Sequence, residues 1–232
     1  MTGRTRLAVA ALIALVPVGR LRIALYRRLL GYRIGRGCRV GMLNLVACRS
    51  LTLGDGSVIG RGNLLKGDFD FVAGPRLFMG NFNVLTCPWR LAERSPSRGY
   101  ATLIEFGADC LVNDRHYLDG HGRISVGDGS WIAGRDSQLY THGISVEDRD
   151  IAIGRGCYIG TATRFAPGSG VGDRSIVGMG SVVLDRIGAE AVLVAGFPAR
   201  AVRDLSAALA AGRYRFSKDD WGDGAPPPPG PR

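Results

Sequence analysis

The chain contains only three histidines, and imidazole is the side chain that titrates closest to neutral pH. His116, His121 and His142 all lie near a polar stretch that interrupts an otherwise regular sequence pattern. An imidazole can act as a general base toward a hydroxyl group, or it can bind a metal ion. A single histidine near a turn is more often a structural hydrogen-bonding residue. The elements that position the three rings therefore decide between these roles.

Those elements follow a six-residue repeat. Between residues 153 and 183 every sixth residue is apolar, Gly or Ala follows each of the first five, and a small residue lies four positions after each of them. The apolar positions are Ile153, Ile159, Phe165, Val171, Val177 and Val183, and the small residues are Cys157, Thr163, Ser169, Ser175 and Ser181. A period of six fits neither a helix nor an alternating hairpin strand. It predicts a coil of very short parallel strands, with a permissive residue at each turn.

This pattern resembles the hexapeptide-repeat acyltransferases, and in particular their galactoside and maltose O-acetyltransferase-like branch. The resemblance covers about residues 31–205. It implies a left-handed parallel β-helix with three hexapeptides per coil. The handedness comes from the resemblance, since the general rule for parallel crossovers favours the right hand. We therefore expect an all-β solenoid with an N-terminal helical cap and a C-terminal helix.

Breaks in the repeat define the expected domain organisation. The β-helix is predicted to span residues 32–200, and the polar stretches 92–103 and 137–150 are predicted to leave the coil as loops. Residues 201–216 are predicted to form the C-terminal helix. The Pro- and Gly-rich tail 217–232 has the composition of a disordered segment.

Residues 1–31 form an apolar and basic segment that admits two interpretations. Residues 7–19 are apolar and follow Arg4 and Arg6, as in a signal peptide, but no A-x-A cleavage site follows, and thirteen residues are too few to span a bilayer. One interpretation is a helical cap that shields the open end of the coil, which a solenoid requires. The other is an interfacial anchor on anionic lipid, which would place a cytoplasmic protein at the inner face of the membrane.

The composition favours an anionic partner. The formal net charge is +10, although only two of the thirty basic residues are lysines. Heavy use of Arg and Ala indicates a GC-rich coding bias, which accounts for part of the basic excess. The remainder suits a nucleotide-bearing cofactor or an acidic lipid surface. Basic and aromatic residues do not interleave as they do in nucleic-acid-binding proteins, so we expect no nucleic acid partner.

The five cysteines favour a reducing compartment. They are odd in number, form no CxxC pair, and three of them occupy the small-residue position of their hexapeptides. The five are Cys38, Cys48, Cys87, Cys110 and Cys157. We expect small buried thiols rather than disulfides or a zinc site.

The resemblance implies a catalytic role for His142. In the galactoside and maltose acetyltransferase-like branch, the histidine at this place is the general base, which takes a proton from the acceptor hydroxyl as its oxygen attacks the thioester of an acyl-CoA. From FGADCL to one residue before His142, the spacing matches that branch without a gap. Asn113 then corresponds to the family's asparagine that helps to hold the acceptor sugar. Asn113 could instead bridge strands through its amide.

The resemblance also implies an acetyl-CoA site. Tyr158 replaces a Trp that often lines the family's pantetheine tunnel, and backbone groups near four further residues correspond to those that bond the pantetheine amides. These four are Gly160, Thr161, Gly178 and Met179. The signature AGFPARAVR makes Arg200 and Arg203 candidates for the cofactor's phosphates, or simply a solvated helix start. Asp185 stands where the family has a Lys, which weakens the expected affinity for the 3′-phosphate.

Two side chains beside Asn113 are candidates for contact with the acceptor. Asp114 follows it directly, and His116 lies in the same hexapeptide, VNDRHY. His116 occupies the small-residue position, which is unusual for imidazole. It could contact the acceptor, or it could be a packed histidine with its nitrogens satisfied.

These features predict an acetyl-CoA-dependent O-acetyltransferase, without a metal, acting on a sugar hydroxyl in a polysaccharide or glycolipid pathway. The resemblance implies a homotrimer with active sites between subunits. N-acetylation of an amino sugar or nucleotide-sugar is the nearest alternative. A metal hydratase of the γ-carbonic anhydrase type would use His116 and His121, but the chain has no further histidine upstream. A non-catalytic scaffold would not need His142, Asn113 and the AGFPAR motif.

Overall fold

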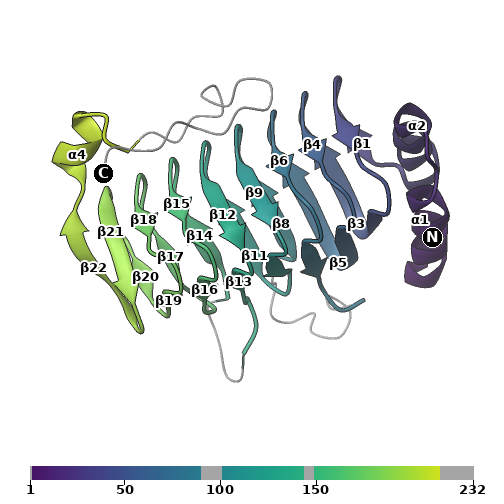
Figure 1. The fold of residues 1–232 in the computed structure, drawn as a ribbon. Helices are drawn as coiled ribbons and strands as arrows, with labels where there is room; N and C mark the ends of the chain where they lie inside the picture. The colour runs from purple at the N-terminus through teal and green to yellow at the C-terminus, as the bar shows by residue number, and fades with distance from the viewer. Residues whose placement is uncertain (1, 90–100, 144–148, 215–232) are drawn as a thin grey trace.

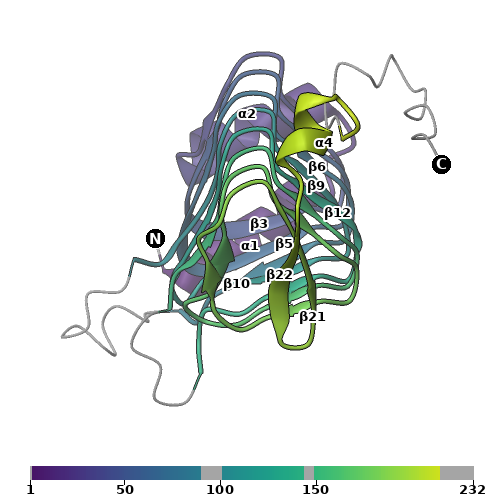
Figure 2. The ribbon, with the colours of Figure 1, turned by 90° about the vertical axis from the view of Figure 1, so that its left-hand side faces the viewer.

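The computed structural model describes residues 2–89, 101–143 and 149–214, and it shows a solenoid of short parallel strands stacked along one axis. Two helices cover its N-terminal end, and a hairpin and a short helix close the other end (Figure 1). Seen along the axis, the coils lie one behind another with similar outlines (Figure 2). This architecture confirms the predicted β-helix.

One coil takes eighteen residues where the repeat is regular. Tyr158 pairs with Ile176, and Arg164 pairs with Val182, each pair eighteen residues apart. Parallel pairing at this separation means that three six-residue segments make one turn of the coil. The inward apolar position of each hexapeptide is buried, as it is at Phe165. Period six therefore arises because one side chain per segment fills the interior.

The strands form two sheets within the described residues. Strands of the larger sheet are β1 (Arg33–Ile34), β3 (Leu45–Leu53), β5 (Leu64–Ala73), β7 (Val84–Thr86), β8 (Leu103–Phe106), β10 (Tyr117–Asp119), β11 (Arg123–Val126), β13 (Gln138–Leu139), β14 (Ile151–Ile153), β16 (Arg164–Phe165), β17 (Gly170–Val171), β19 (Val182–Val183) and β20 (Arg186–Ile187). Strands of the smaller sheet are β2 (Arg39–Val40), β4 (Val58–Ile59), β6 (Phe78–Met79), β9 (Leu111–Asp114), β12 (Trp131–Arg135), β15 (Tyr158–Ile159), β18 (Ile176–Val177), β21 (Val192–Gly196) and β22 (Ala199–Asp204). The first half of β5 pairs with β7 and the second half with β8, so this strand joins two faces of the coil. Its side chains alternate between buried and partly exposed, which explains why the six-residue repeat blurs there.

The chain leaves the coil twice. Paired residues lie 33 positions apart across the first excursion and 27 across the second. Both predicted loops are too long, because strand pairing extends into them. Leu103 begins β8 instead of ending the loop 92–103, and Gln138–Leu139 form β13 inside the predicted loop 137–150. Most of the first loop and the middle of the second lie outside the described residues.

A ladder of buried polar side chains runs along one corner of the coil. Asn44, Asn63 and Asn83 stack so that Oδ1 of Asn44 and Oδ1 of Asn63 each accept hydrogen bonds from the backbone and side-chain amides of the next asparagine. His116 continues the ladder: its backbone N–H donates to Asn83 Oδ1 at 2.9 Å, and its Nδ1 accepts from the N–H of Ser137 at 3.1 Å. Burial lowers the pKa of His116 to about 4, so the ring is neutral.

The helices α1 (Gly3–Ala14) and α2 (Gly19–Leu30) pack on the first coil, which confirms that the N-terminal segment is a cap. Ile13 and Tyr26 belong to the hydrophobic core. The guanidinium of Arg22 is buried and donates to backbone carbonyls of the first coil and of the link between the helices. These N–H groups donate hydrogen bonds to backbone carbonyls at the end of the stack, and those carbonyls would otherwise lack a donor. Within the described residues, neither helix combines the length and the apolar character needed to cross a bilayer.

The C-terminal end differs from the prediction. β21 and β22 pair in antiparallel fashion, with Gly196 opposite Ala199, so the residues up to Asp204 form a strand. The predicted C-terminal helix is present as α4 (Ser206–Ala210), but it begins five residues later than predicted and holds five residues, while residues 215 and 216 lie outside the described part of the chain. Backbone pairing with β21 outcompetes helix formation in the first residues of this segment. The tail, predicted to be disordered, lies outside the described residues.

All five cysteines are thiols rather than disulfides, and four of the five are buried. Burial raises the pKa of Cys48 and Cys87 to about 12 and that of Cys157 to about 11. These thiols are protonated at neutral pH and act as small packing groups.

Candidate active site

A carboxylate and two imidazoles meet where two neighbouring strands end. β10 ends at Asp119, and β13 pairs with it in register, with Leu118 beside Leu139. His121 lies two residues after Asp119, and His142 lies three residues after β13, so the strand register brings both rings to one carboxylate. His121 Nδ1 contacts Oδ1 of Asp119, and His142 Nδ1 lies 2.5 Å from Oδ2.

Asp119 is fully buried and hydrogen-bonded on both oxygens. In addition to the two rings, the backbone N–H of Thr141 donates to Oδ2 at 3.0 Å, and the hydroxyl of Thr141 donates to the backbone carbonyl of Asp119 at 2.5 Å. Burial alone would raise the pKa of Asp119, but the hydrogen bonds from His121 and His142 outweigh it, and the pKa is lowered. A charged carboxylate can only accept hydrogen bonds, so each Nδ1 carries its hydrogen. In a neutral ring Nε2 then keeps its lone pair.

The two rings differ in their access to solvent. The side chain of His142 is 48% exposed, whereas that of His121 is 19% exposed. Their ring centroids lie 4.3 Å apart, and Tyr140 meets His142 edge-on at 6.4 Å. His142 is therefore the imidazole that can exchange a proton with a molecule on the surface of the coil. His121 packs against it.

The same three side chains form a donor set that could hold a divalent metal, since their ligand atoms lie within 4.8 Å of one another. Two imidazoles and a carboxylate are ligands that zinc accepts. Ligands around one tetrahedral zinc stand about 3.3 Å apart, given metal–ligand distances of about 2.0 Å. The contact of 2.5 Å between His142 Nδ1 and Asp119 is a hydrogen-bond distance instead. The geometry favours a hydrogen-bonded cluster.

The predicted acceptor residues lie at the other end of β10. Asn113 and Asp114 end β9, and His116 lies in the corner between β9 and β10, three strand residues or about 10 Å before Asp119. His116 is 1% exposed and points into the coil, so the prediction that it contacts the acceptor is wrong. Asp114 accepts a hydrogen bond of 2.6 Å from the N–H of Asn81. Substrate contacts by Asn113 and Asp114 stay predictions.

The predicted pantetheine contacts lie on the same corner in later coils. They are Gly160 and Thr161 after β15, and Gly178 and Met179 after β18. The side chain of Met179 is 78% exposed, while the hydroxyl of Thr161 donates to the carbonyl of Arg135 at 2.9 Å. A Cβ added at Gly160 would lie 2.8 Å from the nitrogen of Met179, so close stacking of the coils requires glycine there. Tyr158 is partly buried beside Trp131, with ring centroids 6.4 Å apart.

One face of the solenoid links these two groups of residues. β7, β10, β13, β16 and β19 lie side by side in it. The corner with the predicted pantetheine contacts precedes β16, and the Asp119 cluster follows β10 and β13, so they flank opposite edges of this face. Two or three strand residues, or about 7–10 Å, separate the edges.

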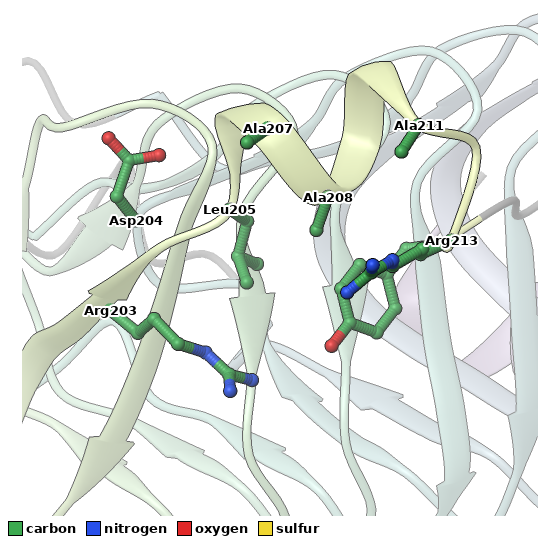
Figure 3. Close-up of a pocket in the computed structure, with 8 residues that line it drawn as sticks. Arg203, Asp204, Leu205, Ala207, Ala208, Ala211 and Arg213 are labelled. Carbon is green, nitrogen blue, oxygen red and sulfur yellow. The ribbon is translucent and has the colours of Figure 1, made fainter. Parts of the chain in front are cut away.

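The two candidate phosphate-binding arginines lie in different surroundings. Arg200 Nη1 lies 3.4 Å from Oδ2 of Asp185, the residue that replaces the family's Lys. Arg203 lines an open pocket of about 300 Å³ beneath α4, together with Arg213 and Tyr214 (Figure 3). The pocket thus gathers two guanidinium groups and an aromatic ring. Arg213 and Tyr214 were not predicted as site residues.

Asp119 is the functional residue that sequence reasoning missed. The available signal was YLDGHG, which puts a carboxylate and an imidazole where the chain leaves a regular strand. Its partner could not be read from spacing, because His142 reaches Asp119 only through the pairing of β10 with β13. His121 was considered only as a metal ligand, whereas it shares the carboxylate with His142.

Comparison with known proteins supports the fold. No protein-family model and no curated protein sequence matches this chain. Galactoside acetyltransferase in complex with coenzyme A is 18% identical, and the similarity covers 93% of this chain and 84% of that one, with a TM-score of 0.50. A hexapeptide-repeat acetyltransferase from Vibrio cholerae O1 biovar eltor, in complex with acetyl-CoA, is 21% identical over 88% of this chain and 87% of its own, with a TM-score of 0.47. UDP-N-acetylglucosamine acyltransferase from Campylobacter jejuni is 18% identical, and the similarity covers 82% of this chain and 76% of that one, with a TM-score of 0.49. This chain therefore has the hexapeptide-repeat β-helix fold of galactoside acetyltransferase.

Proposed function

We propose that the protein is an acyltransferase that moves an acetyl group from acetyl-CoA to a sugar hydroxyl, with His142 as the general base. The observation that carries this proposal is the contact between Asp119 and His142. A buried, charged carboxylate holds one nitrogen of a ring that is itself half-exposed on the coil. Such an arrangement fixes the tautomer and orientation that proton abstraction requires. The fold shared with galactoside acetyltransferase agrees with this chemistry.

The proton path follows from the tautomer. His142 Nε2 accepts the proton of the acceptor hydroxyl as the hydroxyl oxygen forms its bond to the thioester carbon. The C–S bond breaks, and the imidazolium returns that proton to the departing sulfur. Asp119, which accepts from Nδ1, stabilises the imidazolium between these two steps and acts as a positioning residue. Acetyl-CoA supplies an already activated acyl group, so no acyl-enzyme is required.

The donor would lie along the corner that carries Thr161 and Met179. The exposed side chain of Met179 offers an apolar contact for a pantetheine arm. For the phosphates, Arg203 and Arg213 in the pocket beneath α4 are better candidates than Arg200, because Asp185 already pairs with Arg200. Two forked guanidinium groups suit a diphosphate or a 3′-phosphate.

A homotrimer with active sites between subunits is part of the proposal. Its basis is the resemblance to hexapeptide-repeat acyltransferases, together with a half-exposed His142 and an exposed Met179 on one chain. A partner subunit packed against this face would cover both side chains and shield the thioester from water. Sedimentation analysis should give three times the chain mass of 24.7 kDa.

The test is release of free thiol from acetyl-CoA in the presence of sugars, nucleotide-sugars and lipid-linked sugars. The proposal predicts acceptor-dependent release and an acetyl ester that mild alkali hydrolyses. An alkali-stable amide product would show N-acetylation instead. No release with any acceptor, and no rise of the melting temperature on addition of coenzyme A, would mean that the solenoid is a scaffold.

A further inference from the structure

The charge of the chain is concentrated at one end of the solenoid. Residues 1–54 contain ten arginines and no acidic residue, so they carry the whole formal net charge of +10. Residues 55–232 contain twenty basic and twenty acidic residues and are formally neutral. A coding bias toward arginine would act on the whole chain and does not explain this asymmetry. The basic end is the one that α1 and α2 cover (Figure 1).

Part of this charge is used within the fold. Arg22 and Arg27 donate to backbone carbonyls. Arg49 pairs with two aspartates of β5, and Arg36 pairs with Asp55. Five other arginines of this end are exposed and form no ion pair within the described residues. They are Arg4, Arg20, Arg28, Arg33 and Arg39.

The cap also exposes several apolar side chains. Five residues from the end of α1, the link and α2 are each more than half exposed: Leu12, Leu15, Val18, Leu21 and Leu29. The opposite side of the helices packs on the coil through residues such as Ile13 and Tyr26, so the exposed side chains face away from it. Met42 and Leu43 extend the patch, because the N–H of Leu43 donates to the last residue of α1.

Basic and apolar side chains share this outer side of the cap. Arg4 lies two turns before Leu12 on α1, and Leu21 lies two turns before Arg28 on α2, so each pair shares a helix face. We call the five exposed apolar residues of the cap, together with Arg4, Arg20 and Arg28, the cap surface.

We propose that the cap surface docks on a bilayer of anionic lipids, parallel to the membrane and without crossing it. The leucines would enter the headgroup region, and the arginines would contact lipid phosphates, which is how interfacial helices bind. Charge complementarity favours anionic lipid over a second copy of the chain at this surface. A second copy of the chain would bring its own Arg4, Arg20 and Arg28 against the same positively charged face. The cap thus closes the coil with its inner side and binds lipid with its outer side, so the two interpretations of the N-terminal segment are compatible.

Co-sedimentation of the full chain with lipid vesicles tests this proposal. The protein should bind vesicles that contain phosphatidylglycerol and should not bind pure phosphatidylcholine vesicles. Binding should weaken at high salt, which screens the charges. The triple variant Arg4→Gln, Arg20→Gln, Arg28→Gln should bind about a hundredfold more weakly, at about fivefold for each arginine near the surface.

A second variant isolates the apolar contribution. Leu12→Ser, Leu15→Ser and Leu21→Ser together should abolish sedimentation with the vesicles, while the protein stays folded with a melting temperature lowered by only a few degrees, because all three residues are more than half exposed. Val72→Ser and Val202→Ser, at exposed positions elsewhere on the solenoid, are the matched controls and should bind as wild type does.

Three results would overturn the proposal: no binding to phosphatidylglycerol vesicles, full binding by the serine variant, or a change of oligomeric state in the serine variant. The last would show that a second copy covers the surface. The proposal does not depend on the acyltransferase assignment. Thiol release with a soluble acceptor should be the same in the serine variant and wild type, so the two proposals can fail separately.

Discussion

Replacing Asp119 by Asn tests the carboxylate that positions His142. The change keeps the shape of the side chain but offers one acceptor oxygen and one N–H donor group in place of two acceptor oxygens. If the amide oxygen takes the place of Oδ2, the contacts with Thr141 and His142 survive. The amide nitrogen then faces His121, which can present an unprotonated Nδ1. The fold should therefore persist while the negative charge is lost.

The magnitude follows from the lost charge. The charge-assisted hydrogen bond and the Coulomb attraction between an imidazolium and a carboxylate are together worth about 2 kcal/mol more than the neutral hydrogen bond that an amide oxygen keeps, which corresponds to about thirtyfold in rate. Because His142 becomes charged only after it has taken the proton, the loss should fall on kcat, and the KM for acetyl-CoA should change little. A loss of this kind separates a positioning role from general structural damage.

Steady-state thiol release is the assay for Asp119→Asn, with the melting temperature as the check on folding. Asp128→Asn is the matched control, since this carboxylate accepts a hydrogen bond of 2.7 Å from the N–H of Ala108 and lies outside the cluster. A kcat within about threefold of wild type in folded Asp119→Asn protein would refute the positioning role, because the expected loss is about ten times larger. A change in KM with kcat unchanged would also refute the positioning role.

Three further predictions concern the fold and the metal question. His116 takes up a proton below about pH 6.5 in the unfolded chain but only near pH 4 in the folded chain. Protonation therefore favours the unfolded state between these two pH values. The free energy of unfolding should fall by about 1.4 kcal/mol per pH unit as pH falls through this range, a total loss of about 3 kcal/mol. His116→Asn should extend the ladder of Asn44, Asn63 and Asn83, and urea unfolding should show less acid sensitivity than in wild type; equal sensitivity would contradict this. Arg22→Met should lower the free energy of unfolding by about 2–4 kcal/mol, because it deprives the carbonyls of Val16 and Val40 of their donor, whereas exposed Arg28→Met should cost under about 0.5 kcal/mol. Protein purified without a His tag should contain less than one zinc ion per chain by elemental analysis. One zinc ion per chain in the wild type, lost in Asp119→Asn, would identify the cluster as a metal site instead.

The coil was predictable because its periodicity is local. One inward apolar residue per six recurs from Ile153 to Val183, and Gly or Ala follows it in each of the first five hexapeptides. Loss of that period located both excursions. Their ends were misplaced because strand pairing reaches into polar sequence at Leu103 and at Gln138–Leu139. The C-terminal helix was overestimated for a related reason, since β22 gains its stability from pairing with β21.

The candidate site was predictable only in part. His142 was identified through the resemblance, and the structure places its ring on the surface of the coil. Asp119 was missed because a carboxylate 23 residues away becomes a partner only through strand register. His116 was left as either an acceptor contact or a packed histidine, because the polar ladder that accommodates an imidazole at its small-residue position involves three coils upstream.

The most direct test of the proposed mechanism is acetyl transfer by the variant His142→Ala, measured as product formed per active protein. We expect turnover lower than wild type by about two to four orders of magnitude, with an unchanged melting temperature and unchanged binding of coenzyme A. Wild-type turnover in the correctly folded variant would contradict it.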